Sequence, residues 1–174
     1  MPRPPFVADV VALRRHQGHR EQVVVRAPLK GMRVTESWVP DDSMVDVDVV
    51  LEAVEGGIVA EGHVSAGWVG ECRRCLGPVS GAIQADVSEL FVPEPEEGEA
   101  YPILGDHIDL EPLAREAIVL ALPLVPLCRP DCKGLCPNCG ADLNAGPCAC
   151  ETNNRDARWS ALDALTLDAP RDKS

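Results

Sequence analysis

The sequence has no long apolar run and few aromatic residues. None of its apolar stretches reaches the roughly 20 residues that a membrane-spanning helix requires, and the opening MPRPPFVADVVALRRHQ contains no apolar core typical of a signal peptide. We therefore expect a cytoplasmic protein without a membrane segment. Aromatic residues make up only 3% of the chain, so its core must be built from Val, Leu, Ala and Ile.

Basic residues are also scarce. The chain has 16 Lys and Arg against 28 Asp and Glu, a net charge of −12, which opposes general electrostatic attraction to nucleic acid. Residues 1–34 are the exception, with a local charge of +5, whereas the remainder carries −17. Arg14, Arg15, Arg20 and Arg26 in this segment form either a basic arm that contacts rRNA or the solvated face of a strand, and both interpretations stay open.

Cysteine is the abundant reactive residue, with eight in 174 positions. The cytosol keeps thiols reduced, which disfavours disulfides. Redox catalysis of the thioredoxin type needs a Cys-x-x-Cys unit that opens a helix, but here Cys75 and Cys139 are followed by turn residues. Zinc is the metal that best fits sites made only of thiolates in a cytosolic protein.

Two zinc sites are the simplest partition of eight ligands, because structural zinc takes four. One site would hold Cys136, Cys139, Cys148 and Cys150, which are close in the sequence. The other would join Cys128 and Cys132 to the distant pair Cys72 and Cys75, and so clamp the C-terminal segment to the upstream sheet. A rival partition places one zinc among the six C-terminal cysteines and leaves Cys72 and Cys75 free.

The hydrophobic pattern of the rest of the chain predicts an α+β fold. Residues 21–27, 45–54, 58–69 and 79–91 are rich in Val or alternate in polarity, which favours an antiparallel meander that can close like a barrel. Glu55-Gly56-Gly57 forms one turn of this meander and Cys72–Cys75 another. Residues 92–110 are rich in Pro and Glu and predict a mobile acidic loop.

One buried helix follows this loop. Asp109 can cap it, Leu113, Ala117, Leu120 and Ala121 recur on one face, and Pro123 ends it. A short final helix is expected from Asp156. We therefore predict a sheet-and-helix domain over residues 1–127 and a zinc-binding segment over residues 128–174.

A series of motifs, in order along residues 20–165, resembles the YceD family of large ribosomal RNA subunit accumulation proteins. They are Glu55–Gly62, Glu71-Cys72-Arg73-Arg74-Cys75-Leu76, Glu89-Leu90-Phe91, Ile108-Asp109-Leu110, Leu120–Pro123, Cys132–Gly140, Leu143-Asn144, Cys148-Ala149-Cys150 and Asp156–Trp159. The resemblance implies a role in accumulation of 23S rRNA and in assembly of the large ribosomal subunit. The partner would then be a large-subunit precursor or a ribosomal or assembly protein. The family supplies no catalytic residues to carry over.

We therefore expect a zinc-stabilised factor that is not an enzyme, because four thiolates leave zinc no open position for water. A metal-dependent RNA-processing enzyme is the first alternative. It would need an open carboxylate or histidine site, for which only the acids of residues 94–111 are available. The second alternative is a thiol or zinc redox sensor that uses Cys72 and Cys75, whose neighbouring arginines would make the thiolates more reactive.

Overall fold

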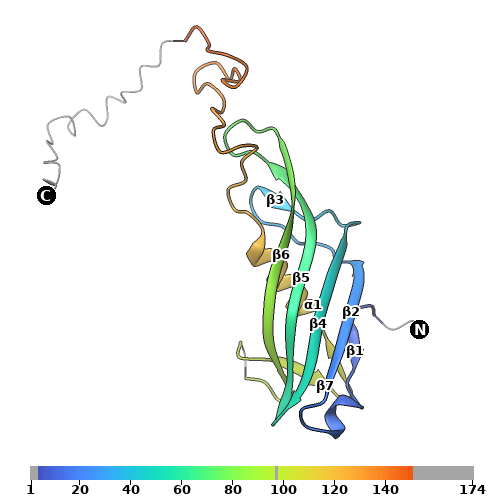
Figure 1. Ribbon diagram of the computed structural model, residues 1–174. Helices are drawn as coiled ribbons and strands as arrows, with labels where there is room; N and C mark the ends of the chain where they lie inside the picture. Colours follow the sequence, from blue (N-terminus) through green and yellow to red (C-terminus); the bar gives the residue numbers. More distant parts are fainter. Residues whose placement is uncertain (1–3, 97, 151–174) are drawn as a thin grey trace, which may run out of the picture. The chain divides into compact units, whose positions relative to one another are not determined.

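The computed structural model describes residues 4–96 and 98–150 of the chain. A curled β-sheet with one α-helix forms most of this part (Figure 1). In chain order the elements are β1 (Val7–Asp9), the 3₁₀ turn η1 (Leu13–Arg15), β2 (Arg20–Pro28), β3 (Ser37–Trp38), β4 (Met44–Val54), β5 (Gly57–Glu71), β6 (Pro78–Val92), β7 (Tyr101–Leu104), β8 (His107–Asp109) and α1 (Glu111–Ala121). The predicted final helix from Asp156 lies outside the described residues.

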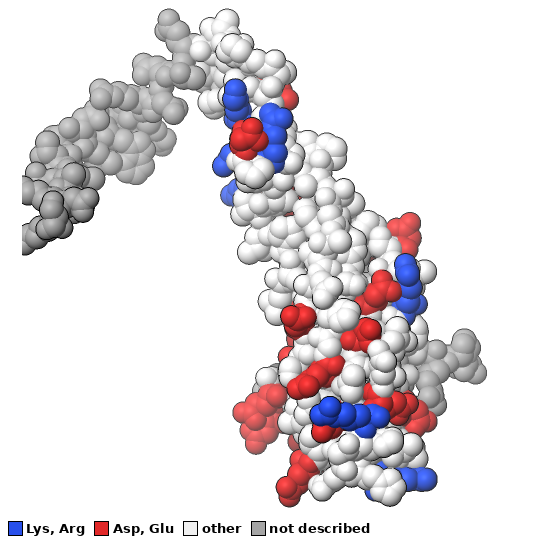
Figure 2. Space-filling model, viewed as in Figure 1, with Lys and Arg blue, Asp and Glu red and all other residues white. Residues whose placement is uncertain are grey.

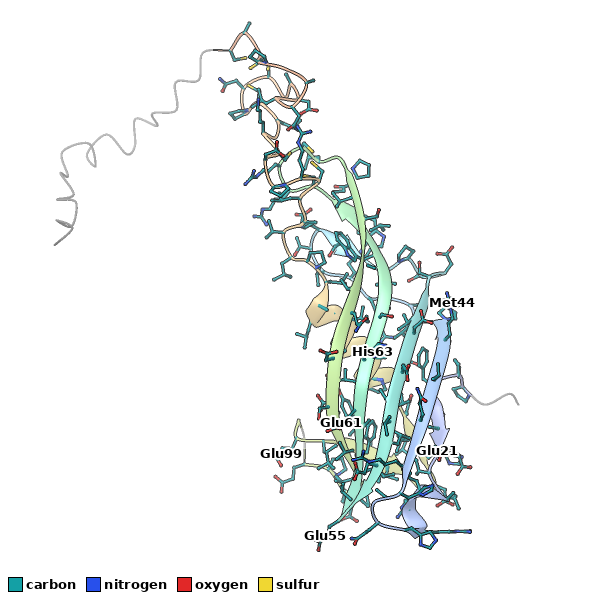
Figure 3. The ribbon with its side chains drawn as sticks, in the orientation of Figure 1. Glu21, Met44, Glu55, Glu61, His63 and Glu99 are labelled. Carbon is teal, nitrogen blue, oxygen red and sulfur yellow. The ribbon has the colours of Figure 1, made fainter. Side chains whose placement is uncertain are left out.

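Four long strands confirm the predicted antiparallel meander. Strand β4 pairs with β2 on one side and with β5 on the other, and β5 pairs with β6 along nearly its whole length. On β4 the side chains alternate strictly, and Val45, Val47, Val49 and Leu51 are almost completely buried. Outward positions include Asp46, Asp48 and Glu52 on β4, and Glu61 and His63 on β5 are two of the side chains labelled in Figure 3. This alternation fixes the register, because a slip of one residue would expose the whole apolar set.

The predicted acidic loop over residues 92–110 is wrong in its second half, which contains β7 and β8. Strand β7 pairs in parallel with the end of β6 and antiparallel with β8, and β8 pairs with β1 near the start of the chain. Ile103 and Ile108 are buried there, and the ring of Tyr101 stacks on Phe91 with their centroids 5.3 Å apart. The sheet is therefore mixed, runs in the order β1-β8-β7-β6-β5-β4-β2, and curls into an incomplete barrel.

Helix α1 packs against β5 and β6 on the inner side of the sheet. Leu110, not Asp109, occupies the N-cap position of the helix. The Asp109 carboxylate, one residue earlier, still accepts a hydrogen bond from the Glu111 N–H of the first turn at 2.9 Å. Leu113, Ala114 and Ile118 are buried, but Leu120 is 86% exposed, so its predicted place on the packed face is wrong. Apolar residues run more than halfway round this helix, so their periodicity does not determine which side faces the sheet.

The basic N-terminal segment contributes strands β1 and β2 to the sheet, and the 3₁₀ turn η1 lies between them. Arg20 pairs with Glu52 at 2.5 Å and Arg26 with Asp46 at 3.4 Å, both across β2 and β4. The Arg14 guanidinium donates to the Gly105 carbonyl at 2.8 Å. These contacts are those expected of a solvated strand face, and the predicted rRNA contact of this segment stays a prediction.

The contacts of the chain fall into two compact units, one ending at Gly134 and the other beginning at Leu135. All the strands and α1 belong to the first unit. The predicted division into residues 1–127 and 128–174 stays a prediction about how the chain folds. Across the described ranges, no helix has the length and apolar character that crossing a membrane requires.

Candidate metal centres

The first cysteine cluster forms where the turn between β5 and β6 meets the segment after α1. Cys72 and Cys75 lie in that turn, which is closed by hydrogen bonds from the Cys72 N–H to the Gly77 carbonyl and from the Leu76 N–H to the Cys72 carbonyl. The segment after α1 is attached at two points. Pro123 accepts from the buried Ser37 hydroxyl at 2.8 Å, and Pro126 accepts from the Arg73 N–H at 3.0 Å. These contacts deliver Cys128 and Cys132 to the turn.

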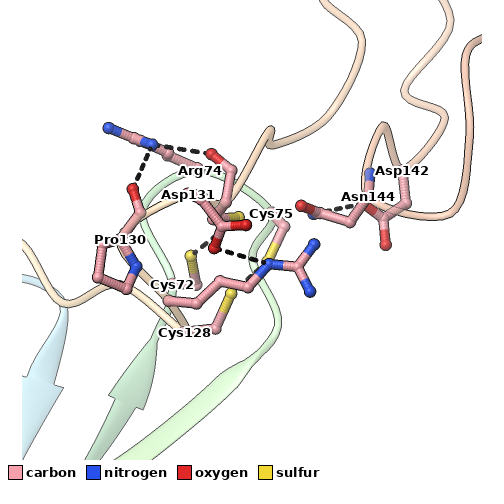
Figure 4. Close-up of polar contacts among 10 residues, drawn as sticks. Cys72, Arg74, Cys75, Cys128, Pro130, Asp131, Asp142 and Asn144 are labelled. Atoms are coloured by element: carbon pink, nitrogen blue, oxygen red, sulfur yellow. Dashed lines mark hydrogen bonds and ion pairs between the residues drawn. The ribbon is translucent and has the colours of Figure 1, made fainter.

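The four sulfurs of this cluster have the spacing of a tetrahedral site (Figure 4). The Sγ atoms of Cys75 and Cys128 lie 3.7 Å apart, those of Cys72 and Cys132 lie 3.8 Å apart, and all four fall within 4.8 Å of one another. A tetrahedral zinc with Zn–S bonds of about 2.3 Å places its sulfurs about 3.8 Å apart. The spacing is too long for disulfides, and Cys72, Cys75, Cys128 and Cys132 are all free thiols.

Backbone N–H groups stabilise the thiolate of Cys72 in this cluster. Hydrogen bonds from the Cys128 and Cys75 backbones lower the pKa of Cys72 to about 6. The hydrogen bond with Cys132, together with burial, raises the pKa of Cys128 to about 12. A second thiolate in the cluster is therefore disfavoured. At Cys75 the Gly77 N–H lowers the pKa, but the hydrogen bond with Cys72 and burial outweigh it and the pKa is raised. A divalent cation would relieve this repulsion among four thiolates.

Arg74 holds the first cluster together through hydrogen bonds that the sequence does not predict. Its guanidinium Nη1 donates to the Pro130 carbonyl at 3.2 Å and to the Cys132 carbonyl at 2.8 Å, so the side chain ties the turn to the ligand-bearing segment. Gly134 also lies so close to Arg74 that a Cβ at this glycine would sit 2.8 Å from the Arg74 carbonyl oxygen. The Arg-Arg pair inside the turn was the available sequence signal, but it indicated only positive charge beside the thiolates.

The second cluster joins Cys136, Cys139, Cys148 and Cys150, whose Sγ atoms also lie within 4.8 Å of one another. Its turn is closed by the Gly140 N–H donating to the Cys136 carbonyl at 2.9 Å, and the Cys136 N–H donates to the Ala141 carbonyl at 2.8 Å. Hydrogen bonds from the Cys139 and Asn138 backbones lower the pKa of Cys136 to about 6. The side chain of Cys139 and burial raise the pKa of Cys150 to about 12. The electrostatic arrangement of the first cluster is therefore repeated.

Both clusters match the predicted two-site partition and not the rival one, because Cys72 and Cys75 stand in a complete set of four. Each set is closed, with thiols alone as candidate ligands. Over residues 4–96 and 98–150, no other group of three or more His, Cys, Asp or Glu side chains gathers at metal-binding distances. The acids of residues 94–111 that a metal-dependent nuclease would need are therefore not assembled into a site in the part of the chain that is described.

These features define a class of protein: a curled, mostly antiparallel sheet around one helix, with a Cys₄ cluster at one turn and a second Cys₄ cluster later in the chain. Within that class the chain belongs to the YceD family, described as Large ribosomal RNA subunit accumulation protein YceD, which matches residues 60–166. No solved structure matches the chain.

Several proteins resemble this chain over most of its length. An uncharacterised protein of Mycobacterium tuberculosis is 36% identical over 168 residues, which cover 91% of this chain and 80% of that protein. The large ribosomal RNA subunit accumulation protein YCED homolog 1, chloroplastic, of Arabidopsis thaliana is 26% identical over 80% of this chain and 54% of its own length. The Zea mays protein of the same name is 27% identical over 64% of this chain and 49% of its own length.

Proposed function

We propose that this protein supports accumulation of 23S rRNA by acting, without catalysis, in assembly of the large ribosomal subunit. The observation that carries the proposal is membership of a family whose plant relatives are named for accumulation of large ribosomal subunit RNA. The partner would be a large-subunit precursor particle or a ribosomal or assembly protein, met in the cytoplasm.

We further propose that both cysteine clusters hold zinc. The sulfur spacing of 3.7 and 3.8 Å in the first cluster supports a tetrahedral ion of this size. Zinc would there fasten the segment after α1 to the turn between β5 and β6. In the second cluster it would hold together a segment with little regular structure of its own. An ion with four thiolate ligands supports shape and has no open position for an activated water, which is why we assign no catalysis to it.

The cellular test is depletion of the protein in cells that produce it. We expect the ratio of 23S to 16S rRNA to fall and precursor particles to accumulate on sucrose gradients, with the protein co-sedimenting with those particles. Re-expression of the wild-type chain should restore the ratio, whereas Cys72→Ser/Cys128→Ser should not. Unchanged rRNA ratios and unchanged gradients after complete depletion would overturn the assignment.

The enzyme alternative is tested separately with purified protein. Precursor rRNA incubated with the protein and magnesium should keep its length. Cleavage that is lost after removal of the protein's metal would instead support an RNA-processing enzyme.

A further inference from the structure

The turn of the first cluster contains a backbone anomaly. Leu76 has a φ of 59°, and in the described part of the chain it is the only residue other than glycine with positive φ. The second cluster places Gly140, with a φ of 72°, directly after its own Cys-x-x-Cys unit, where Leu76 stands in the first. A β-carbon is strained in this conformation, and glycine is the residue that normally fills it.

The leucine side chain does not compensate for this strain by packing. Leu76 is 60% exposed, so its apolar surface contributes little to the core. A strained residue with an exposed apolar side chain is not explained by stability, and such outliers gather where a surface binds something.

Leu76 lies on the wall of a groove of about 450 Å³. Trp38, Val69, Pro78 and Val79 contribute the other apolar walls, and Glu71 contributes a carboxylate. Trp38 reaches this groove because β3 pairs with β5 and places it opposite Val69. The Arg33 guanidinium stacks on the Trp38 ring at 5.0 Å from its centroid, and Arg33 does not line the groove. The ring is therefore held in position by a cation and presents aromatic surface to the groove.

Basic side chains surround this end of the sheet. The exposed basic residues here are Arg73, Arg74, Arg129 and Lys133, and Arg129 is paired with Asp131 at 3.4 Å. Figure 2 shows basic side chains near the first cluster, whereas acidic side chains predominate over the other end of the sheet on this face. Arg73 is of particular interest because none of the ion pairs in the described part of the chain involves it. Arg20 and Arg26, by contrast, are paired with carboxylates on β4.

From this juxtaposition we infer that the groove between Trp38 and Leu76 binds an unpaired nucleotide of RNA, with the base against these two side chains and the neighbouring phosphates on Arg73 and Arg74. Bases of single-stranded RNA stack on aromatic side chains, and arginines hold the adjoining backbone. Glu71 accepts hydrogen bonds from the amino groups of a base and repels phosphate, so it favours entry of the base itself. The acidic remainder of the sheet confines RNA to this end. The inference rests on the proposed function only in taking the RNA to be ribosomal.

The test is fluorescence anisotropy of a labelled single-stranded RNA of about 12 nucleotides, with full-length protein whose metal content has been measured. The same sequence as a duplex is the comparison. Single-stranded RNA should bind more tightly than duplex, because a paired base cannot enter the groove. Trp38→Ala should weaken binding about tenfold, and Trp38→Phe should restore most of it, because both aromatic rings stack on a base.

Leu76→Gly separates binding from stability. Glycine relieves the backbone strain, so the variant should unfold at a higher temperature than wild type while its affinity for the RNA falls several-fold. Leu120→Ala is the matched control, because it also removes an exposed leucine and lies on helix α1. Arg73→Gln should weaken binding and reduce its salt dependence, whereas Arg20→Gln should change neither.

Several results would overturn the inference. They are absence of RNA binding, equal binding of duplex and single strand, and equal affinity of wild type, Trp38→Ala and Leu76→Gly. If these variants lost co-sedimentation with particles yet none of the proteins bound RNA, the groove would take a protein partner and the inference would be wrong. Loss of 23S rRNA on depletion without RNA binding in vitro would leave the proposed function standing.

Discussion

Gly62 shows how closely β4 and β5 approach each other at a single residue. A Cβ at this position would sit 2.1 Å from the Asp48 carbonyl oxygen and 2.7 Å from the Val49 Cα, both backbone atoms of the paired strand. Backbone in the middle of a sheet cannot move aside without breaking its ladder. Gly67 on the same strand has no such neighbour, since the nearest atom lies 4.0 Å from the place that a Cβ would take there.

We therefore expect Gly62→Ala to destabilise the protein by about 2 kcal/mol or more, as overpacking does when the surroundings cannot relax. Gly67→Ala should change the free energy of unfolding by less than about 0.5 kcal/mol. Urea unfolding followed by circular dichroism measures both values. Equal stability of the two variants would show that β4 and β5 are spaced more loosely than the structure has them.

The cysteines give a second prediction at the residue scale. Because each cluster is a closed set of four, Cys75→Ser should remove one metal ion and leave the other. Cys139→Ser should do the same for the second cluster. Native mass spectrometry should then give two zinc ions for wild type, one for each single variant and none for the double variant. Two ions in either single variant would contradict the four-ligand assignment.

Helix α1 illustrates how a whole element depends on which of its faces is buried. Ile118 is fully buried between the helix and the sheet, whereas Leu120, two residues further on, is 86% exposed. Ile118→Ala should cost about 2–5 kcal/mol, because it removes buried methyl groups and leaves a cavity. Leu120→Ala should cost less than about 0.5 kcal/mol. Denaturant unfolding of the two variants measures the difference, and a larger loss for Leu120 would mean that the helix is rotated from the position described.

Tyr101 connects strand β7 to the same helix. Its hydroxyl donates a hydrogen bond to the Glu116 carboxylate, and burial together with this carboxylate raises the pKa of Tyr101. A raised pKa means that the folded state favours the protonated phenol. The contribution to stability is therefore complete below the unfolded value of about 10 and is lost as the pH rises above it.

We expect wild type to lose stability on alkaline titration more steeply than Tyr101→Phe, which has no phenol to ionise. Thermal unfolding between neutral pH and about pH 11 measures the two slopes. Parallel slopes would mean that the Tyr101 phenol ionises equally readily in the folded and unfolded chains.

On the scale of the whole molecule, the chain combines a sheet with a large apolar core and a cysteine-rich segment with little regular structure. The sheet can fold on burial of Val, Leu and Ile side chains alone. The second cluster lies in the unit that begins at Leu135, where the described residues contribute few buried apolar side chains. Zinc binding supplies folding free energy in such segments. Removal of metal should therefore affect the second unit more than the first.

A strong chelator provides the measurement. Hydrogen exchange should rise across residues 136–150 after metal removal, whereas the amides of β4 and β5 should stay protected because their ladder and core are unaffected. The Cys139→Ser variant should reproduce this pattern without a chelator. Loss of protection in β4 and β5 at the chelator concentration that exposes residues 136–150 would show that the sheet also needs the ion.

Local sequence patterns were enough to specify the long meander and the grouping of the cysteines. Strict alternation along β4 leaves one register that buries the apolar set, and the Cys-x-x-Cys spacing leaves two sets of four as the simplest arrangement. The alternation depends only on neighbouring residues, and the grouping of the cysteines depends only on their number and spacing. Both can therefore be read without knowledge of the fold.

The remaining features depend on how the elements pack in three dimensions. Strands β1, β7 and β8 are only three or four residues long, which is too short to show a period. The pairing of β1 with β8 also joins residues about 100 positions apart, and no local pattern predicts it. The buried face of α1 depends on where the sheet lies, because apolar residues surround most of the helix. The groove at Trp38 and Leu76 exists because β3 pairs with β5 beside the first cluster, which brings together side chains that are distant in the sequence. Such contacts follow from the packing of elements, and no pattern of neighbouring residues encodes them.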